Sequence, residues 1–217
     1  MPLSPDIRSA AESLHRGSQS IAAVTNNKMD QANRFSRALE ALELLSSERE
    51  IPIAIVGGLG AIRYGYPTVT EDIDVAVARD QLDSFLRVAK EYGFRIAWKA
   101  ESGWHTLTHD DVEINIVPEG GKAKNDAPTN IPGPNQLGVQ EGLGYATLPR
   151  WVELKISSYR RKDQTHIVEV LKKGEPQAIE HIRRHLSSVH PIYLDRFNEL
   201  ATEAAAEKEQ ENDRGSH

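Results

Sequence analysis

Apolar residues recur at helical spacing early in the chain and then give way to a short, uniformly apolar run. Four of them stand three or four positions apart, namely Phe35, Leu39, Leu42 and Leu45. This period predicts a helix over residues 30–47. Residues 53–56 are all apolar and are followed by two glycines, which is typical of a buried strand that ends in a tight turn.

Short strand patterns and one longer helix pattern follow in the middle of the chain. Helices are expected over residues 59–64 and 81–92, the second with Asp80 as its N-cap and Gly93 at its end. Strands are expected over residues 73–78, 94–98, 104–108 and 112–117, the last two as a hairpin. Residues 118–144 are rich in glycine and proline and have no period, so they are expected to form a loop.

The remainder of the chain has helical patterns only. Helices are expected over residues 148–159, 162–172 and 176–189, followed by an exposed, fraying helix after Ile192. Residues 1–29 are polar and weakly patterned and are expected to form a frayed helix or a loose arm. Strands with helices followed by helices alone predict an α+β fold. We expect an α+β core with its N-terminal arm over residues 1–147, a helical region over 148–213 and a purification-tag remnant at 214–217.

Composition narrows the class of protein. The chain has 217 residues, 39% of them hydrophobic and 27% charged, and no apolar run is long enough to span a membrane. The absence of cysteine excludes disulfides and Cys-bound zinc, and the N-terminus lacks the pattern of a signal peptide, which favours a cytoplasmic location. A net charge of −6 argues against broad nucleic-acid binding, although basic residues gather at 155–162. Such a cluster is usually a solvated helix face.

The three tryptophans are candidates for stacking against a base: Trp98, Trp104 and Trp151. Tryptophans at strand and helix positions more often belong to the core, so a core role is expected for them.

The stretch that indicates chemistry begins at the paired glycines Gly57 and Gly58 and ends at Asp72 and Asp74. Glycines after a buried strand let the backbone approach a ligand closely, and a short helix that starts there suits a phosphate group. Two aspartates two positions apart in a strand project from one face. Paired carboxylates repel each other unless a cation lies between them, and hard oxygen ligands suit Mg²⁺. The combination is typical of phosphoryl or nucleotidyl transfer.

The chain resembles the polymerase-β-type nucleotidyltransferases in five segments. These are Val56-Gly57-Gly58, Gly65-Tyr66-Pro67, the stretch from Thr70 to Val75, Val112-Glu113-Ile114-Asn115 and the late helix with Lys155 and Asp163. The resemblance spans about residues 50–172, and the group it is most similar to includes the AbiEii-type toxins and minimal nucleotidyltransferases. It implies a small mixed β-sheet core flanked by helices.

The resemblance also implies site residues in the core. Gly57 and Gly58 would hold the triphosphate of the nucleotide. Asp72 and Asp74 would bind the catalytic metal ions, Mg²⁺ or Mn²⁺, and Glu113 would be the third carboxylate. The fold of the family implies that the strand of Glu113 is the neighbour of the strand of Asp74. Because Glu113 lies on the face opposite Val112, Ile114 and Ile116, we expect its carboxylate to turn toward the pair.

Two further site residues are implied in the helical region. Lys155 matches a lysine that contacts nucleotide phosphates in relatives, and Asp163 matches an acidic residue of the same region. Lys155 stands at the edge of the apolar face of its helix, and we expect it to face the same cleft as Gly57 and Gly58.

The implied activity is the transfer of a nucleoside monophosphate from an NTP to a hydroxyl acceptor with release of pyrophosphate. The acceptor would be a tRNA or a protein, in the setting of a toxin and its cognate antitoxin. Three departures from the family pattern bear on activity: Leu59 replaces a serine, Thr68 replaces an arginine and Glu113 replaces an aspartate. They leave open an inactive relative that binds nucleotides or partners. An interaction protein in which the Asp72–Asp74 pattern is incidental also stays open.

Overall fold

The computed structural model describes residues 26–215, with side chains from Asn33 to Arg214. Most of the arm expected over residues 1–29 and the last two residues of the tag remnant lie outside the described residues. The chain divides into two compact units. The first comprises the residues up to Arg63, Pro67–Gly121 and Ile131–Ala146, and the second comprises Tyr64–Tyr66, Lys122–Asn130 and the residues from Thr147 onward.

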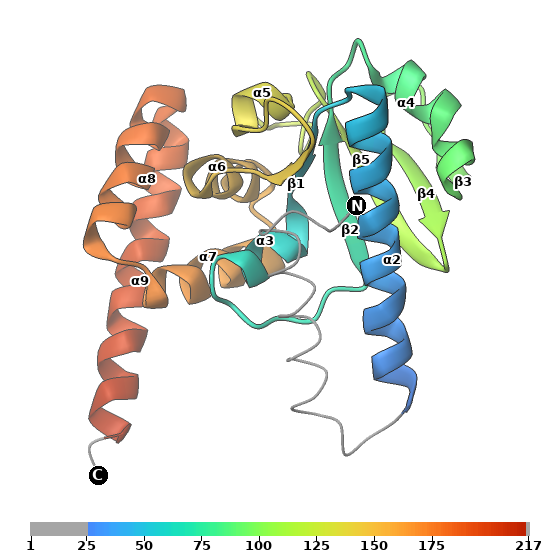
Figure 1. Ribbon diagram of the computed structural model, residues 1–217. Coiled ribbons are helices and arrows are strands. Elements are labelled where there is room, and N and C mark those ends of the chain that lie inside the picture. The colour runs from blue at the N-terminus through green and yellow to red at the C-terminus, as the bar shows by residue number, and fades with distance from the viewer. Residues whose placement is uncertain (1–25, 216–217) are drawn as a thin grey trace. The chain divides into compact units, whose positions relative to one another are not determined.

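The first unit contains the strands and the helices that pack on them (Figure 1). In chain order its elements are α2 (Asn26–Arg49), β1 (Ile53–Ile55), α3 (Gly57–Arg63), β2 (Asp72–Val77), α4 (Leu82–Val88), the 3₁₀ helix η1 (Ala89–Tyr92), β3 (Arg95–Lys99), β4 (His105–His109), β5 (Val112–Pro118), α5 (Pro134–Leu137) and β6 (Leu143–Tyr145).

The six strands form one mixed sheet in the order β3-β4-β5-β2-β1-β6. Strand β2 runs parallel to β5, and β6 runs parallel to β1, whereas the other neighbours are antiparallel. The α+β class with a mixed sheet is therefore confirmed. The prediction that residues 118–144 form only a loop is wrong in its second half, because α5 and β6 form there. Three residues are too few to carry a period, so β6 is defined by its pairing with β1.

One face of the sheet is the core of the first unit. The alternation in β2 buries Ile73 and Val75 on that face, and Ile114 and Ile116 of β5 lie beside them. Helix α2 packs there through the apolar stripe that begins at Phe35. The opposite face carries the polar residues of the same strands, including both aspartates of β2.

The helix expected over residues 81–92 is interrupted. It consists of α4 followed by the tighter turn η1, and its N-cap is Gln81 with no capping side chain, so the expectation for Asp80 is wrong. Gly93 ends the segment in the left-handed conformation at φ 84°, as its position predicted.

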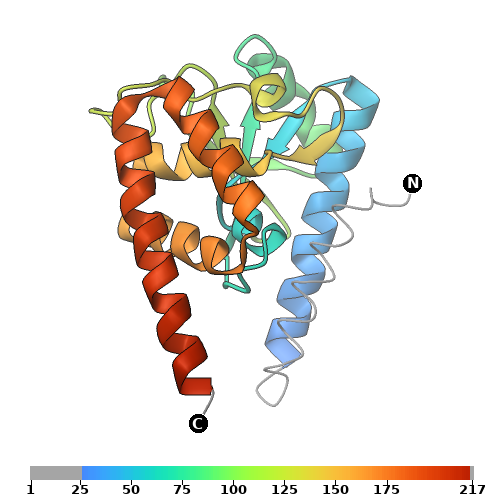
Figure 2. The ribbon, with the colours of Figure 1, turned by 90° about the vertical axis from the view of Figure 1, so that its left-hand side faces the viewer.

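The second unit contains helices from Leu148 onward, as the pattern of that part of the sequence predicted. Its elements are α6 (Leu148–Ser158), α7 (Arg161–Lys173), α8 (Pro176–Val189) and α9 (Pro191–Gly215). Figure 2 shows α8 beside the long helix α9. Four residues of α9 at helical spacing are buried, namely Tyr193, Phe197, Leu200 and Ala204. The tail is thus a packed helix along its first half, which corrects the expectation of an exposed one.

None of the helices that the structure describes combines the length and the apolar character needed to cross a bilayer.

Candidate active site

Asp72 and Asp74 project from one face of β2 and are both half-buried, while Ile73 between them is fully buried. This arrangement follows from the two-residue period of a strand, and it is what the sequence predicted. Both carboxylates lie in the first unit on the face of the sheet that points away from α2.

A side chain that the sequence did not single out joins the two carboxylates. The Nδ2 group of Asn115 donates hydrogen bonds to Oδ2 of Asp72 at 3.1 Å and to Oδ1 of Asp74 at 3.3 Å. The Thr106 hydroxyl on β4 donates to Oδ1 of Asn115 at 3.2 Å, which fixes the orientation of the amide. Asn115 is the residue of β5 that pairs with Asp74. It therefore holds both aspartates while adding no charge.

Glu113 lies on the strand adjacent to that of Asp74, as expected, and pairs in register with Asp72. Its side chain is exposed and shares the face of the two aspartates, because paired positions of neighbouring strands point the same way. Among the residues that the structure describes, no three acidic or histidine side chains converge tightly enough to form a metal-binding group. The side chain that contacts both aspartates is Asn115, and the metal-binding role of Glu113 stays a prediction.

The two glycines bring the first turn of α3 against the carboxylates. At Gly57 φ is +60°, and a Cβ atom built there would lie 1.9 Å from Oδ2 of Asp74. A Cβ at Gly58 would lie 2.6 Å from the hydroxyl of Thr70. Neither position accepts a side chain without displacing these neighbours.

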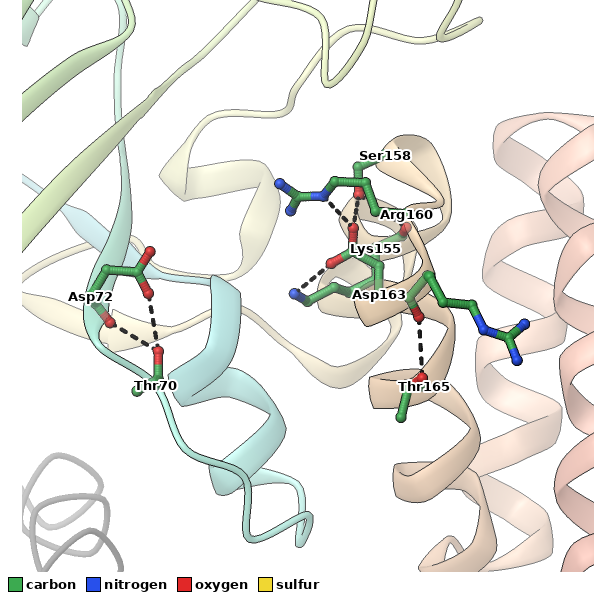
Figure 3. Close-up of polar contacts among 8 residues, drawn as sticks. Thr70, Asp72, Lys155, Ser158, Arg160, Asp163 and Thr165 are labelled. Atoms are coloured by element: carbon green, nitrogen blue, oxygen red, sulfur yellow. Dashed lines mark hydrogen bonds and ion pairs between the residues drawn. The ribbon is translucent and has the colours of Figure 1, made fainter.

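Thr70 links the same turn to the first aspartate. Its buried hydroxyl lies 3.0 Å from Oδ1 and 3.1 Å from the backbone oxygen of Asp72 (Figure 3). Gly58 touches Thr70, and Thr70 in turn holds Asp72. The first turn of α3 therefore lies close against Asp74 and against Thr70, and Thr70 in turn bonds to Asp72.

We predict that Gly57→Ala disrupts the position of Asp74 as well as straining the backbone. Gly142→Ala is the matched control, because Gly142 has φ +64° but nothing within 4 Å of its Cβ position. The control should lose about 1–2 kcal/mol of stability from the left-handed conformation alone. Gly57→Ala should lose more in chemical denaturation and should also lose divalent-ion binding by calorimetry. Equal behaviour of the two variants would refute the close contact.

Lys155 and Asp163 form a buried ion pair in the second unit. The Lys155 ammonium lies 2.8 Å from Oδ1 of Asp163, and their side chains are 8% and 0% exposed. Ser158 donates to the other carboxylate oxygen at 2.6 Å and Arg160 at 2.8 Å (Figure 3). Burial raises the pKa of Asp163, but Lys155, Arg160 and Ser158 outweigh it and lower the pKa to about 2. The aspartate is therefore a stable anion that holds the lysine in place.

The interpretation of the basic cluster at 155–162 as a solvated helix face holds for Arg160, Arg161 and Lys162, which are exposed, and is wrong for Lys155. Lys155 lies on the last turn of α6 and is buried, whereas Arg160 is 74% exposed. A role of Lys155 toward nucleotide phosphates stays a prediction.

His166 of α7 makes the second unit sensitive to acid. Burial is the largest cause of its low pKa, and together with the positive charges of Lys155 and Lys162 it lowers that pKa to about 4. In the unfolded chain His166 is protonated below about pH 6.5, whereas in the folded chain it is protonated only below about pH 4. The free energy of unfolding therefore falls as the pH drops from about 6.5 to about 4. The expected loss is about 3 kcal/mol.

The variant His166→Phe keeps a ring beside Tyr66, which lies 5.8 Å away by ring centroids, and cannot titrate. Denaturant titrations at pH 7 and pH 4.5 should therefore show a smaller loss of stability for the variant than for the parent protein. Equal losses of stability between pH 7 and pH 4.5 in the two proteins would show that His166 does not cause the acid sensitivity.

Comparison with models of known protein families gives no match, and comparison with curated proteins gives none either. Among solved structures, the chain is similar to the antibiotic-resistance factor ANT(2'')-Ia, whose solution structure reveals substrate-regulated conformation dynamics. The two share 13% identity at a TM-score of 0.44, over 84% of this chain and 98% of the other. A similarity of this size transfers no activity from one protein to the other, so the proposal below rests on the residues of the site.

Proposed function

We propose that this protein is a metal-dependent nucleotidyltransferase whose catalytic centre is the pair Asp72 and Asp74. The observation that carries the proposal is the arrangement around the pair. Two half-buried carboxylates share one face of β2, Asn115 bonds to both, and a glycine turn lies against them.

The donor set fits a divalent cation. Carboxylate oxygens are ligands that Mg²⁺ and Mn²⁺ prefer, and two aspartates side by side give a cation two such oxygens from one face of β2. A bound ion would supply charge stabilisation at the phosphoryl group of a nucleotide. The residues that would hold it are Asp72 and Asp74, with Glu113 as a candidate further ligand from the neighbouring strand.

The proposed reaction transfers a nucleoside monophosphate. An acceptor hydroxyl forms a new bond to the α-phosphorus of an NTP, the bond to the β-phosphate bridging oxygen breaks, and pyrophosphate leaves. The hydroxyl proton passes to solvent or to a nearby carboxylate, for which Glu113 is the candidate because it is exposed beside Asp72. Gly57 and Gly58 would accommodate the triphosphate.

Asn115 gives a direct test of the metal site, because Asn115→Asp places a third carboxylate against the pair. In chelator the variant should melt at a lower temperature than the parent, since three like charges then lie together. Added Mn²⁺ should raise its melting temperature by more than it raises that of the parent. The control Asn135→Asp adds the same charge at an exposed position of α5. A metal response of Asn115→Asp no larger than that of the control would contradict a cation at the pair.

The reaction itself is tested by incubating the full chain with each α-labelled NTP, Mg²⁺ or Mn²⁺, and either total RNA or protein extract. We expect label on one macromolecular fraction, release of pyrophosphate and loss of both in chelator. This outcome would also show whether the acceptor is an RNA or a protein. A toxin role, which the family resemblance supports, predicts that expression of the chain slows growth and that a cognate antitoxin relieves it.

A second candidate function is nucleotide or partner binding without transfer. It is favoured by Asn115, which puts a neutral amide at the position of β5 beside Asp74 where a carboxylate would complete a metal-binding group. In that case NTPs and a divalent ion would stabilise the chain against heat, but no acceptor in the transfer experiment would become labelled.

A further inference from the structure

The polar face of the sheet continues from the two aspartates to the edge strand β3. The pairing of β2, β5, β4 and β3 places one residue of each strand side by side, and two such rows of four residues run across the sheet. The first row is Asp74, Asn115, Thr106 and Trp98, and the second is Asp72, Glu113, Thr108 and Arg95. Because paired residues point to the same face, Trp98 and Arg95 share the face of the candidate active site.

A β-bulge turns Trp98 to this face. Ile96 pairs with Leu107 on the core side, and strict alternation would place Trp98 on that side as well. The register shifts between Ile96 and Trp98, so Trp98 pairs with Thr106 and is 55% exposed. The core role expected of the tryptophans holds for Trp151, which is fully buried, and is wrong for Trp98.

We infer that the acceptor is a single-stranded nucleic acid and that one of its bases stacks on Trp98. This inference rests on the proposed function and names the substrate class of the same site. The nucleic-acid strand would cross the β-sheet along the two rows of residues. Its reactive hydroxyl would lie at Asp72 and Asp74, and one of its bases would stack on the indole ring of Trp98. Arg95 contacts a phosphate of the same strand.

The spacing of the rows favours a polymeric acceptor. Trp98 is three strand spacings from Asp74, which is about 14 Å. A small acceptor bound at the aspartates would not reach the ring, whereas a few stacked nucleotides cover this length. The residues in between are Asn115 and Thr106, so the path offers hydroxyl and amide groups that suit sugars and phosphates.

An exposed aromatic ring on a strand, with an arginine three positions away, is a combination that proteins use to bind single-stranded nucleic acids. The net charge of −6 means that binding depends on stacking more than on general attraction to phosphate. Affinity should therefore fall only slowly with salt. A slope of log K against log salt of about −1 is expected, since each phosphate contact on a single strand contributes about −0.7.

The test is the affinity of the full chain for a fluorescent single-stranded RNA of about twelve nucleotides, measured by fluorescence polarisation. Trp98→Leu keeps an apolar side chain without a ring, and Trp98→Tyr keeps the ring. We expect binding about tenfold weaker for the leucine variant and near the parent value for the tyrosine variant. Melting temperatures check that both variants stay folded, since an exposed edge position tolerates substitution.

Arg95→Gln should weaken binding and make the salt slope shallower, whereas Arg87→Gln, at an exposed arginine of α4, should change neither. A single-stranded DNA of the same sequence distinguishes the two nucleic acids, and a blunt duplex should bind more weakly than either. Equal RNA affinity of the parent and Trp98→Leu would overturn the inference, as would loss of binding in both the leucine and tyrosine variants. The assay contains no NTP and no divalent ion, so its outcome is separate from that of the transfer reaction.

Discussion

Asp72→Asn and Asp74→Asn are each expected to abolish nucleotide transfer while leaving the fold intact. Each substitution removes a candidate metal ligand, and loss of one such ligand should lower the rate by about 10³-fold or more. The amide keeps the size of the side chain, and an oxygen remains to accept the hydrogen bond of Asn115 or Thr70. Removing one of two like charges should not lower stability.

The measurement pairs transfer activity with melting temperature in metal-free buffer. Ser36→Ala on α2, away from the polar face of the sheet, serves as a folded control with expected full activity. Variants that melt well below the parent without metal would assign the pair a structural role. Variants that keep full transfer activity would remove the pair from the catalytic centre.

Asp163→Asn is expected to destabilise the second unit strongly. The substitution leaves the ammonium of Lys155 buried without its counter-charge, which typically costs about 3–5 kcal/mol. Glu180→Gln breaks the exposed pair of α8 with Arg183 and should cost less than about 1 kcal/mol. Urea unfolding of both variants of the full chain gives the comparison.

The double variant Lys155→Met with Asp163→Leu tests whether the unpaired charge of Lys155 causes the loss of stability in Asp163→Asn. It removes both charges and fills the space with apolar groups, so it should recover most of the stability that Asp163→Asn loses. If Asp163→Asn and Glu180→Gln unfold at the same urea concentration, the buried pair does not stabilise the unit. If the double variant is no more stable than Asp163→Asn, the loss comes from packing and not from the unpaired lysine.

The local patterns of the chain predicted the aspartate pair because each pattern depends on near neighbours. The alternation around Ile73 determines that Asp72 and Asp74 share a face, and the glycines mark the turn before α3. The same alternation places Glu113 and Asn115 together on one face of β5. It does not determine which of them lies beside Asp74, because that depends on the register between β2 and β5. The role of Asn115 was therefore visible only in the structure.

Two other differences also come from tertiary structure. The bulge in β3 moves Trp98 to the polar face. The sequence between Ile96 and Trp98 has no residue that predicts a bulge. Lys155 is buried because Asp163, eight residues later on another helix, neutralises it. A helical period alone places a lysine at the edge of an apolar face and favours an exposed position, so burial through an ion pair escapes such a pattern.

The central claim is that Asp72 and Asp74 together hold a divalent cation, and the most direct test is the anomalous scattering of manganese in crystals grown with Mn²⁺ and a non-hydrolysable NTP analogue. We predict an anomalous peak within about 2.0–2.3 Å of a carboxylate oxygen of both aspartates, with the triphosphate against the turn at Gly57. Crystals of Asp74→Asn should lack the peak. A nucleotide bound in the parent crystals with no manganese at the pair would contradict the claim.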